Sequence, residues 1–318
     1  MKTLEGATNI TKLRFGMQSY TLNAQSTDLD LSKCTSLTHF SASYFNVREL
    51  TLPYSITYLN YTQASGNIKF NTEVDSNGIT SSRLNDAYLR ANYKIQSILT
   101  NMGASCLKLN TLEVFNNQGG VTDFSVLKAC SSLNTLKVTG AGWTGKLNYT
   151  NISTLNGLAE SSSLTKIQFS WLTINNLDCI KELTGLTQLY IDNCDLNNIN
   201  GVSNLVNLTT VNINNTRITD ISPLNSCINI TSLTLNNNFI NSGIKELSNL
   251  KKMTILNLTN NSISDRATSS DGTIYKVLEE ILKLNKNGKL KTLKIAGNPG
   301  IIDYSLLGDK ANWNSPDW

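Results

Sequence analysis

The chain has 318 residues, of which 40% are hydrophobic, and a formal net charge of +4 that is spread along its length. This content can bury a sizeable core. The sequence has no Lys/Arg block, which argues against nucleic acid or an anionic membrane as the partner. It also has no apolar run that would make a signal peptide or a transmembrane helix. We therefore expect either a cytoplasmic chain outside the general export route, or a piece of a longer extracellular, cell-surface or virion-associated protein.

Strand-like segments of uneven spacing occupy the first part of the chain. Leu13 and Phe15 mark one strand, Leu37 and Phe40 mark a second, and residues 50–61 hold a third with room for a fourth. Uneven spacing is expected near the end of a solenoid, where the outer turn must be capped.

Two segments have their apolar side chains at helical spacing. Residues 81–103 predict an amphipathic helix on the convex side of an elongated repeat, with Gly103 as its C-terminal stop. A second helix is predicted within residues 272–288, where Gly288 follows its end and the acidic pair at 279–280 is interpreted as a solvated face. The apolar face of this second helix consists of Ile274, Val277, Leu278, Ile281 and Leu282.

Between residues 186 and 258 the phrase L-x-x-L-x-L-x-x-N/C/T-x-L occurs four times, at intervals of 22, 22 and 23 residues. A fixed period in the twenties with this form is the signature of a leucine-rich repeat. Related segments extend the array from residue 109 to residue 298. The repeats begin at Leu109, Leu133, Leu164, Leu186, Leu208, Ile230, Met253 and Leu290.

We therefore predict an α/β fold in one solenoid over residues 1–318. It is expected to be a curved right-handed horseshoe with a parallel sheet on the concave face and short 3₁₀ or helical segments on the convex face. Residues 1–108 form irregular repeats with a helical insertion, and residues 109–298 form the regular array. Residues 299–318 form a C-terminal cap, in which Tyr304 and Trp313 can cover the last turn.

The repeat phrase also predicts which side chains are buried. Alternating Leu, Val and Ile should point into the solenoid, and a buried asparagine should satisfy the backbone groups where the chain turns after each strand. Asn117, Asn238, Asn261 and Asn298 hold this place, with Cys194 and Thr216 as smaller polar substitutes and Leu172 as the exception. In the return arm every third residue should be buried, which suits 3₁₀ turns. These residues are Ile218, Ile221, Leu224 and Cys227.

The cysteines are interpreted as structural. Cys34, Cys130 and Cys227 each stand three residues before the first Leu or Ile of a repeat. Equivalent positions of a solenoid stack in register, so these thiols should be small buried groups in different turns. No C-x-x-C motif occurs, and we expect no disulfide framework.

The segment from Thr219 to Leu224, TDISPL, is followed by ITSLTLNNN from Ile230 to Asn238. These residues resemble the 22-residue repeats of internalin-type bacterial leucine-rich proteins, and similar repeats occur in phage proteins. The resemblance covers residues 164–263 well and residues 109–163 and 290–298 more loosely. It implies a binding or adhesion module that holds a protein on the concave sheet.

The outward strand positions divide the array into two parts. The C-terminal repeats present mostly Thr and Asn, whereas the outward residues between 111 and 192 include charged and aromatic side chains, the composition of an interaction surface. The alternative is that Trp171 and Phe115 fold back onto the rim and that Trp143 anchors its own loop. The candidate concave patch is Glu113, Phe115, Lys137, Lys166, Trp171, Tyr190 and Asp192, with Trp143 and Tyr149 on the adjacent loop.

The sequence offers little for catalysis. Its single histidine, His39, lies in a strand-like segment and is interpreted as an ordinary solvent-facing residue. No phosphate-binding glycine loop and no cluster of metal ligands is evident, so we expect no cofactor and no metal. We therefore predict a non-enzymatic module that binds a protein or glycan without entering a membrane, in an oligomeric state that is left open. The alternative is a structural component of a larger assembly, such as a virion appendage.

Overall fold

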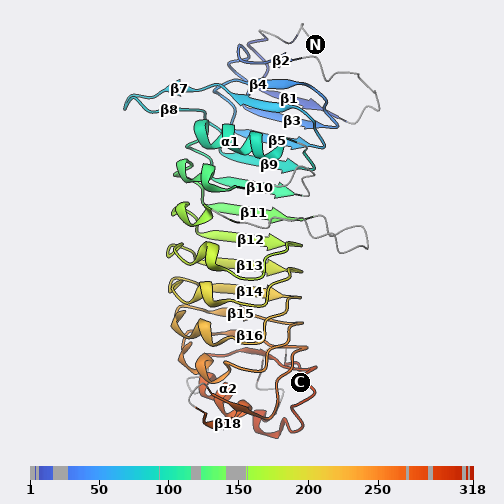
Figure 1. Cartoon of the computed structure of the whole chain (residues 1–318), viewed down its shortest axis with the longest axis vertical. Coiled ribbons are helices and arrows are strands. Elements are labelled where there is room, and N and C mark those ends of the chain that lie inside the picture. The colour runs from blue at the N-terminus through green and yellow to red at the C-terminus, as the bar shows by residue number, and fades with distance from the viewer. Residues whose placement is uncertain are drawn as a thin grey trace. The chain divides into compact units, whose positions relative to one another are not determined.

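The structure is a computed structural model. It describes residues 4, 7–16, 28–92, 94–115, 123–140, 155, 157–269, 272–285, 289–309, 313 and 316–318. The chain divides into two compact units, residues 1–164 (unit 1) and 165–318 (unit 2), and each is described by itself (Figure 1). No described helix is long and apolar enough to cross a membrane.

The main sheet of unit 1 has parallel strands in the order in which they follow one another. Within each strand except β1, buried side chains alternate with side chains that stay half-buried or exposed. The side of the sheet that carries the second set is called the open face. The strands are β1 (Lys12–Phe15), β3 (His39–Ser43), β5 (Tyr58–Thr62), β9 (Asp86–Arg90), β10 (Thr111–Phe115) and β11 (Thr135–Thr139).

Unit 1 also has a second parallel sheet, which the sequence did not predict. It consists of β2 (Leu29–Asp30), β4 (Glu49–Leu52) and β6 (Asn67–Phe70). The predicted third and fourth strands within residues 50–61 therefore both exist, but β4 and β5 belong to different sheets. An antiparallel pair, β7 (Glu73–Val74) and β8 (Thr80–Ser81), projects from the side of the unit (Figure 1).

The prediction of one helix over residues 81–103 is wrong in its first half. Residues 86–90 form β9, with Ala87 and Leu89 buried, and α1 (Ile95–Ser105) begins only afterwards. Leu84, Ala87 and Ala91 have helical spacing, whereas Ala87 and Leu89 alternate as in a strand, and pairing between neighbouring strands decided the outcome. The predicted stop, Gly103, lies inside α1, where a Cβ would come within 2.0 Å of the carbonyl oxygen of Val126. This glycine is required for close packing rather than for ending the helix.

Unit 2 repeats one plan with little variation. Its parallel strands are β12 (Lys166–Ser170), β13 (Gln188–Asp192), β14 (Thr210–Asn214), β15 (Ser232–Thr234), β16 (Ile255–Asn257) and β19 (Thr292–Lys294). As predicted, the return arms contain 3₁₀ turns, and Ile218, Ile221, Leu224 and Cys227 are buried. The turns are η4 (Asp178–Ile180), η5 (Asn200–Val202), η6 (Ser222–Ser226) and η7 (Lys245–Asn249); unit 1 has η2 (Ser125–Ala129) and η3 (Leu158–Glu160).

The predicted asparagine ladder is confirmed in unit 2. Asn238 donates from Nδ2 to the carbonyl oxygens of Ile213 (2.8 Å) and Leu235 (3.0 Å), and its Oδ1 accepts from the backbone N–H (3.0 Å) and hydroxyl (2.5 Å) of Thr216. Asn261 and Asn298 make equivalent bonds. Each amide thus joins two successive turns. Asn117 lies outside the described residues.

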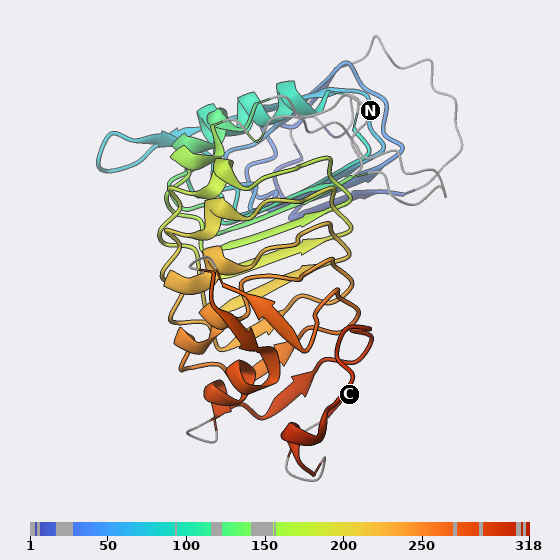
Figure 2. The same cartoon turned by 60° about the horizontal axis from the view of Figure 1, so that its bottom comes forward.

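The C-terminal end of unit 2 is closed by irregular elements (Figure 2). An antiparallel pair, β17 (Arg266–Thr268) and β18 (Ile274–Lys276), precedes α2 (Val277–Asn285), and η8 (Ser305–Leu307) follows β19. The side chain of Trp313 is buried and donates from Nε1 to the carbonyl oxygen of Leu307 (3.1 Å).

Two expectations for the segment around α2 are wrong. Ile274 belongs to β18 and is exposed rather than part of the helix face. Glu280 is not solvated: it is 7% exposed and accepts an ion pair from Lys283 (2.5 Å), whereas Glu279 stays exposed and pairs with Lys276 (3.1 Å). The partner within the helix makes burial of the Glu280 carboxylate tolerable. Gly288 lies outside the described residues.

All six cysteines are free thiols, and Cys34, Cys130 and Cys227 are buried as predicted. Burial raises the pKa of the Cys227 thiol to about 11 and that of Cys130 to about 12. A thiol is reactive only as the thiolate, so these groups act as small packing residues.

We predict that Asn238→Ala lowers the free energy of unfolding by about 2–3 kcal/mol, because it leaves buried backbone groups of two turns without partners. Urea denaturation followed by circular dichroism measures the change. The matched control is Asn197→Ala, since Asn197 is exposed, and it should stay within about 0.5 kcal/mol of the parent. If both substitutions lower the free energy of unfolding equally, the buried amide of Asn238 does not make the proposed contribution to stability.

Candidate functional site

An aromatic row crosses the open face of unit 1. His39 on β3 stacks on Tyr58 of β5 with ring centroids 5.5 Å apart, and Tyr58 packs against Tyr88 of β9 at 5.4 Å. All three side chains are half-buried. Burial raises the pKa of the Tyr88 hydroxyl, and the nearby Asp86 carboxylate adds to this. Tyr88 therefore faces solvent as a neutral hydrogen-bonding group.

A charged network lies beside this row. Glu113 on β10 accepts an ion pair from Arg90 of β9 (2.6 Å) and lies 3.9 Å from the ammonium group of Lys137 on β11. The Arg90 guanidinium also stands 5.7 Å from the centroid of the Phe115 ring. The Glu113 side chain is only 14% exposed, and its carboxylate lies between the cations of Arg90 and Lys137. Three predicted patch residues, Glu113, Phe115 and Lys137, are thus brought together.

The sequence prediction missed Tyr58, Tyr88 and Arg90. A signal was present for the last two, because Leu84-Asn85 repeats Leu109-Asn110 at a distance of 25 residues. That match places Tyr88 and Arg90 opposite Glu113 and Phe115, which is the observed register. The assignment of this stretch to a helix hid the match.

The open face of unit 2 carries a smaller group of functional side chains. Lys166 on β12 places its ammonium nitrogen 5.2 Å from the centroid of the Tyr190 ring on β13. The Tyr190 hydroxyl in turn contacts Gln188 Oε1 at 3.3 Å. Beyond β13 the open face presents small polar side chains, except for the exposed Ile255 and Lys294.

Asp192 has a structural role in unit 2. Its Oδ2 accepts from Asn193 Nδ2 and its Oδ1 from Asn215 Nδ2, both at 2.7 Å. Asn237 then donates to Asn215 (2.9 Å), and Asn260 donates to Asn237 (2.8 Å). The carboxylate therefore terminates a second, exposed ladder of side-chain amides, which the sequence did not predict.

Trp171 has the left-handed backbone conformation that also follows β3, β5 and β9 in unit 1, at Tyr44, Gln63 and Ala91. Its φ is +57°, at the position after the strand where the next four repeats have asparagine at +52° to +57°. Asparagine tolerates the left-handed region, whereas a bulky residue there is strained by about 1–3 kcal/mol. The Trp171 N–H donates to the carbonyl oxygen of Asp192 (3.1 Å), which fixes this conformation. The half-buried side chain agrees with neither full exposure nor complete burial. The asparagines at this position are Asn193, Asn215, Asn237 and Asn260.

Trp143 and Tyr149 lie outside the described residues. His39 contacts the Thr38 hydroxyl through Nδ1 (2.9 Å) and is stacked rather than fully solvent-facing. Among the described residues no three His, Cys, Asp or Glu side chains form a group that could hold a metal ion.

Comparison with solved structures identifies the fold. An internalin (inlF) from Listeria monocytogenes has a TM-score of 0.61 at 21% identity, over 97% of this chain and 87% of its own. The chain has the leucine-rich-repeat fold of the internalins. Internalin C2 from the same organism has a TM-score of 0.51 at 21% identity, over 69% of this chain and 89% of its own. No family model and no curated protein matches this internalin-like chain.

We predict that Trp171→Gly is more stable than Trp171→Ala by about 1 kcal/mol, because both remove the indole but only glycine adopts φ +57° without strain. Urea denaturation of the two variants measures the difference. The control pair at Gln168, inside β12, should show the opposite order, since alanine is favoured over glycine within a strand. The same order at both sites would contradict a strained Trp171.

Proposed function

We propose that the chain is a non-enzymatic recognition module that binds a protein partner through the open face of unit 1. The observation that carries this proposal is the row of His39, Tyr58 and Tyr88 beside the Glu113 network. Half-exposed aromatic rings held among charged groups are typical of the residues that dominate binding energy at protein interfaces. Lys166, Trp171 and Tyr190 in unit 2 form a secondary contact surface.

The packing of the rings supports a protein rather than a glycan. Sugars stack on an open aromatic face, but Tyr58 has a ring against each side, Phe115 has Arg90 over it and Tyr190 has Lys166 over it. The groups left open to a partner are the ring edges, the tyrosine hydroxyls, and the cations of Arg90 and Lys166 that lie over the rings. Such groups suit the side chains and carbonyl groups of a protein surface.

The charges of the open face indicate an acidic partner surface. Lys12 and Arg14 on β1 are exposed and form no ion pair within the described part of the chain. Arg90 and Lys137 share the single carboxylate of Glu113. Asp86 on β9 is a second carboxylate on this face, so the described strand residues carry four cations against two carboxylates. This positive charge would speed association with an acidic surface and make it sensitive to salt.

A second candidate function is a structural component of a larger assembly. The observation that favours it is the uniform open face of β14 and β15, where Thr210, Asn212, Ser232 and Thr234 present no large side chain. Such a surface suits a spacer better than a binding site.

We predict that Tyr58→Ala/Tyr88→Ala abolishes capture of the partner from extracts of host or neighbouring cells, because the variant removes the centre of the aromatic row. The matched control is Thr210→Ala/Asn212→Ala on the open face of unit 2, which should capture the partner normally. Capture by the parent should also fall as salt is raised. Circular dichroism and the melting curve establish that each variant is folded.

Trp171→Ala/Tyr190→Ala tests the secondary surface and should reduce capture. Capture that is unchanged in the variants of both surfaces would overturn the proposal. If the parent captures nothing and instead self-associates into regular assemblies, the structural role is favoured.

A further inference from the structure

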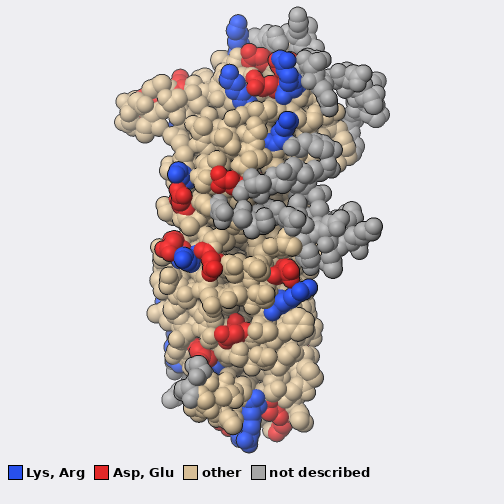
Figure 3. Space-filling model, in the orientation of Figure 1, with Lys and Arg blue, Asp and Glu red and all other residues tan. Residues whose placement is uncertain are grey.

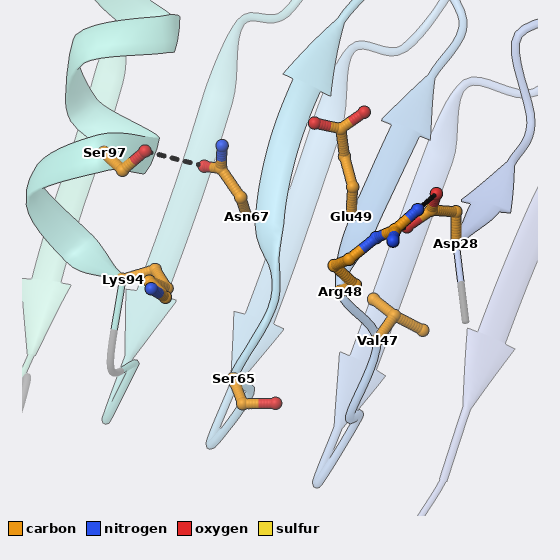
Figure 4. Close-up of a pocket in the computed structure, with 8 residues that line it drawn as sticks. All are labelled: Asp28, Val47, Arg48, Glu49, Ser65, Asn67, Lys94 and Ser97. Carbon is orange, nitrogen blue, oxygen red and sulfur yellow. Dashed lines mark hydrogen bonds and ion pairs between the residues drawn. The ribbon is translucent and has the colours of Figure 1, made fainter. Parts of the chain in front are cut away.

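A pocket of about 630 Å³ opens on unit 1 away from the aromatic row. It lies against the second sheet, between β2, β4 and β6 and the start of α1 (Figure 4). Charged side chains of both signs gather over β2 and β4 on this side of the unit (Figure 3). The second sheet and α1 distinguish this part of the chain from the plain repeats of unit 2, so the pocket is not a feature that every repeat produces.

An ion pair links the ends of β2 and β4 at one wall of the pocket. Arg48 donates from Nε to Asp28 Oδ1 (2.8 Å) and pairs with Oδ2 through a second nitrogen, so the two charges neutralise each other. This contact also lowers the pKa of the Asp28 carboxyl. Close approach of the neighbouring turn requires Gly66, where a Cβ would come within 2.3 Å of the Val47 carbonyl oxygen.

Asn67 on β6 offers a hydrogen-bond donor between the β2–β4 side of the pocket and α1. Its Oδ1 accepts from Ser97 Oγ (3.1 Å) and Asn101 Nδ2 (3.4 Å), both on α1. These bonds fix the orientation of the amide, and its Nδ2 has no partner within the described part of the chain. Such a group can bind a carbonyl or carboxylate oxygen.

The two remaining charges stand on opposite sides of Asn67. Lys94 lies at the start of α1, and Glu49 lies on β4 beside the Arg48–Asp28 pair (Figure 4). Neither forms an ion pair with another described residue. A simple anion would be repelled by Glu49, and a simple cation would be repelled by Lys94. The arrangement therefore matches a ligand that carries both signs of charge at separate points.

We propose that this pocket binds a short peptide segment with an acidic side chain at Lys94 and a basic side chain at Glu49. The backbone between these side chains would accept the Asn67 donor. The volume lies within the range of sites for ligands larger than one amino acid. Neutral sugars fit less well, because the described lining residues include no aromatic ring on which a sugar could stack.

The test uses defined peptides and the full chain. Binding is followed by amide chemical shifts, with the probes acetyl-Glu-Gly-Lys-amide, acetyl-Glu-Gly-Glu-amide, acetyl-Lys-Gly-Lys-amide and cellobiose. We expect the mixed-charge peptide to bind at least tenfold more tightly than either like-charged peptide. Lys94→Gln and Glu49→Gln should each weaken its binding at least fivefold. The control Lys69→Gln, an exposed position on β6 outside the pocket, should leave it unchanged.

The charge-swapped variant Lys94→Glu/Glu49→Lys should recover most of the binding, because the peptide can enter with its charges reversed. Equal affinity for all peptides, cellobiose as the tightest ligand, or unchanged binding in both Gln variants would overturn the proposal. The Tyr58→Ala/Tyr88→Ala variant should retain peptide binding, so failure of one proposal is distinguishable from failure of the other.

Discussion

The architecture depends on satisfying backbone groups where the chain leaves each strand. The turn must be buried for the repeats to stack, yet it has no strand partner for its N–H and C=O groups. In the last three repeats of unit 2 an amide side chain solves this, since Asn238, Asn261 and Asn298 each donate to two turns and accept from a third group. Each repeat is thereby tied to its neighbour by side-chain as well as strand hydrogen bonds, and this makes a 22-residue period repeatable.

The same regularity limits what unit 2 can recognise. Many of its turn positions hold asparagine, both in the buried ladder and in the exposed one that ends on Asp192. Unit 1 is less regular, with a second sheet, a full helix and a projecting hairpin. Both its aromatic row and its polar pocket involve elements that depart from the short repeat. Departures from a consistent pattern are where functional residues are expected.

Trp171 shows how a strained residue and a structural one can be mistaken for each other in a sequence. Trp171 and Asp192 both entered the predicted patch because they are outward, aromatic or charged. In the fold, both carboxylate oxygens of Asp192 accept hydrogen bonds from asparagine side chains of the exposed ladder. Trp171 instead replaces an asparagine at a left-handed position and retains the conformation that suits asparagine. This conformation has a structural role, because the Trp171 N–H donates to the Asp192 carbonyl oxygen, as the Ala91 N–H does to the Phe115 carbonyl oxygen in unit 1.

The sequence alone determined the fold, the register of the regular repeats, the 3₁₀ return arms and the buried asparagines, because each follows from a local pattern that recurs at a fixed period. It also identified Glu113, Phe115 and Lys137 as neighbours, since equal positions in successive repeats stack. It could not decide between strand and helix for residues 86–90, because apolar spacing suits both and only pairing with β5 and β10 selects the strand. For the same reason Tyr58 and Tyr88 became visible as one row, and Asp28, Asn67 and Lys94 as one pocket, only through tertiary contacts that no local spacing encodes.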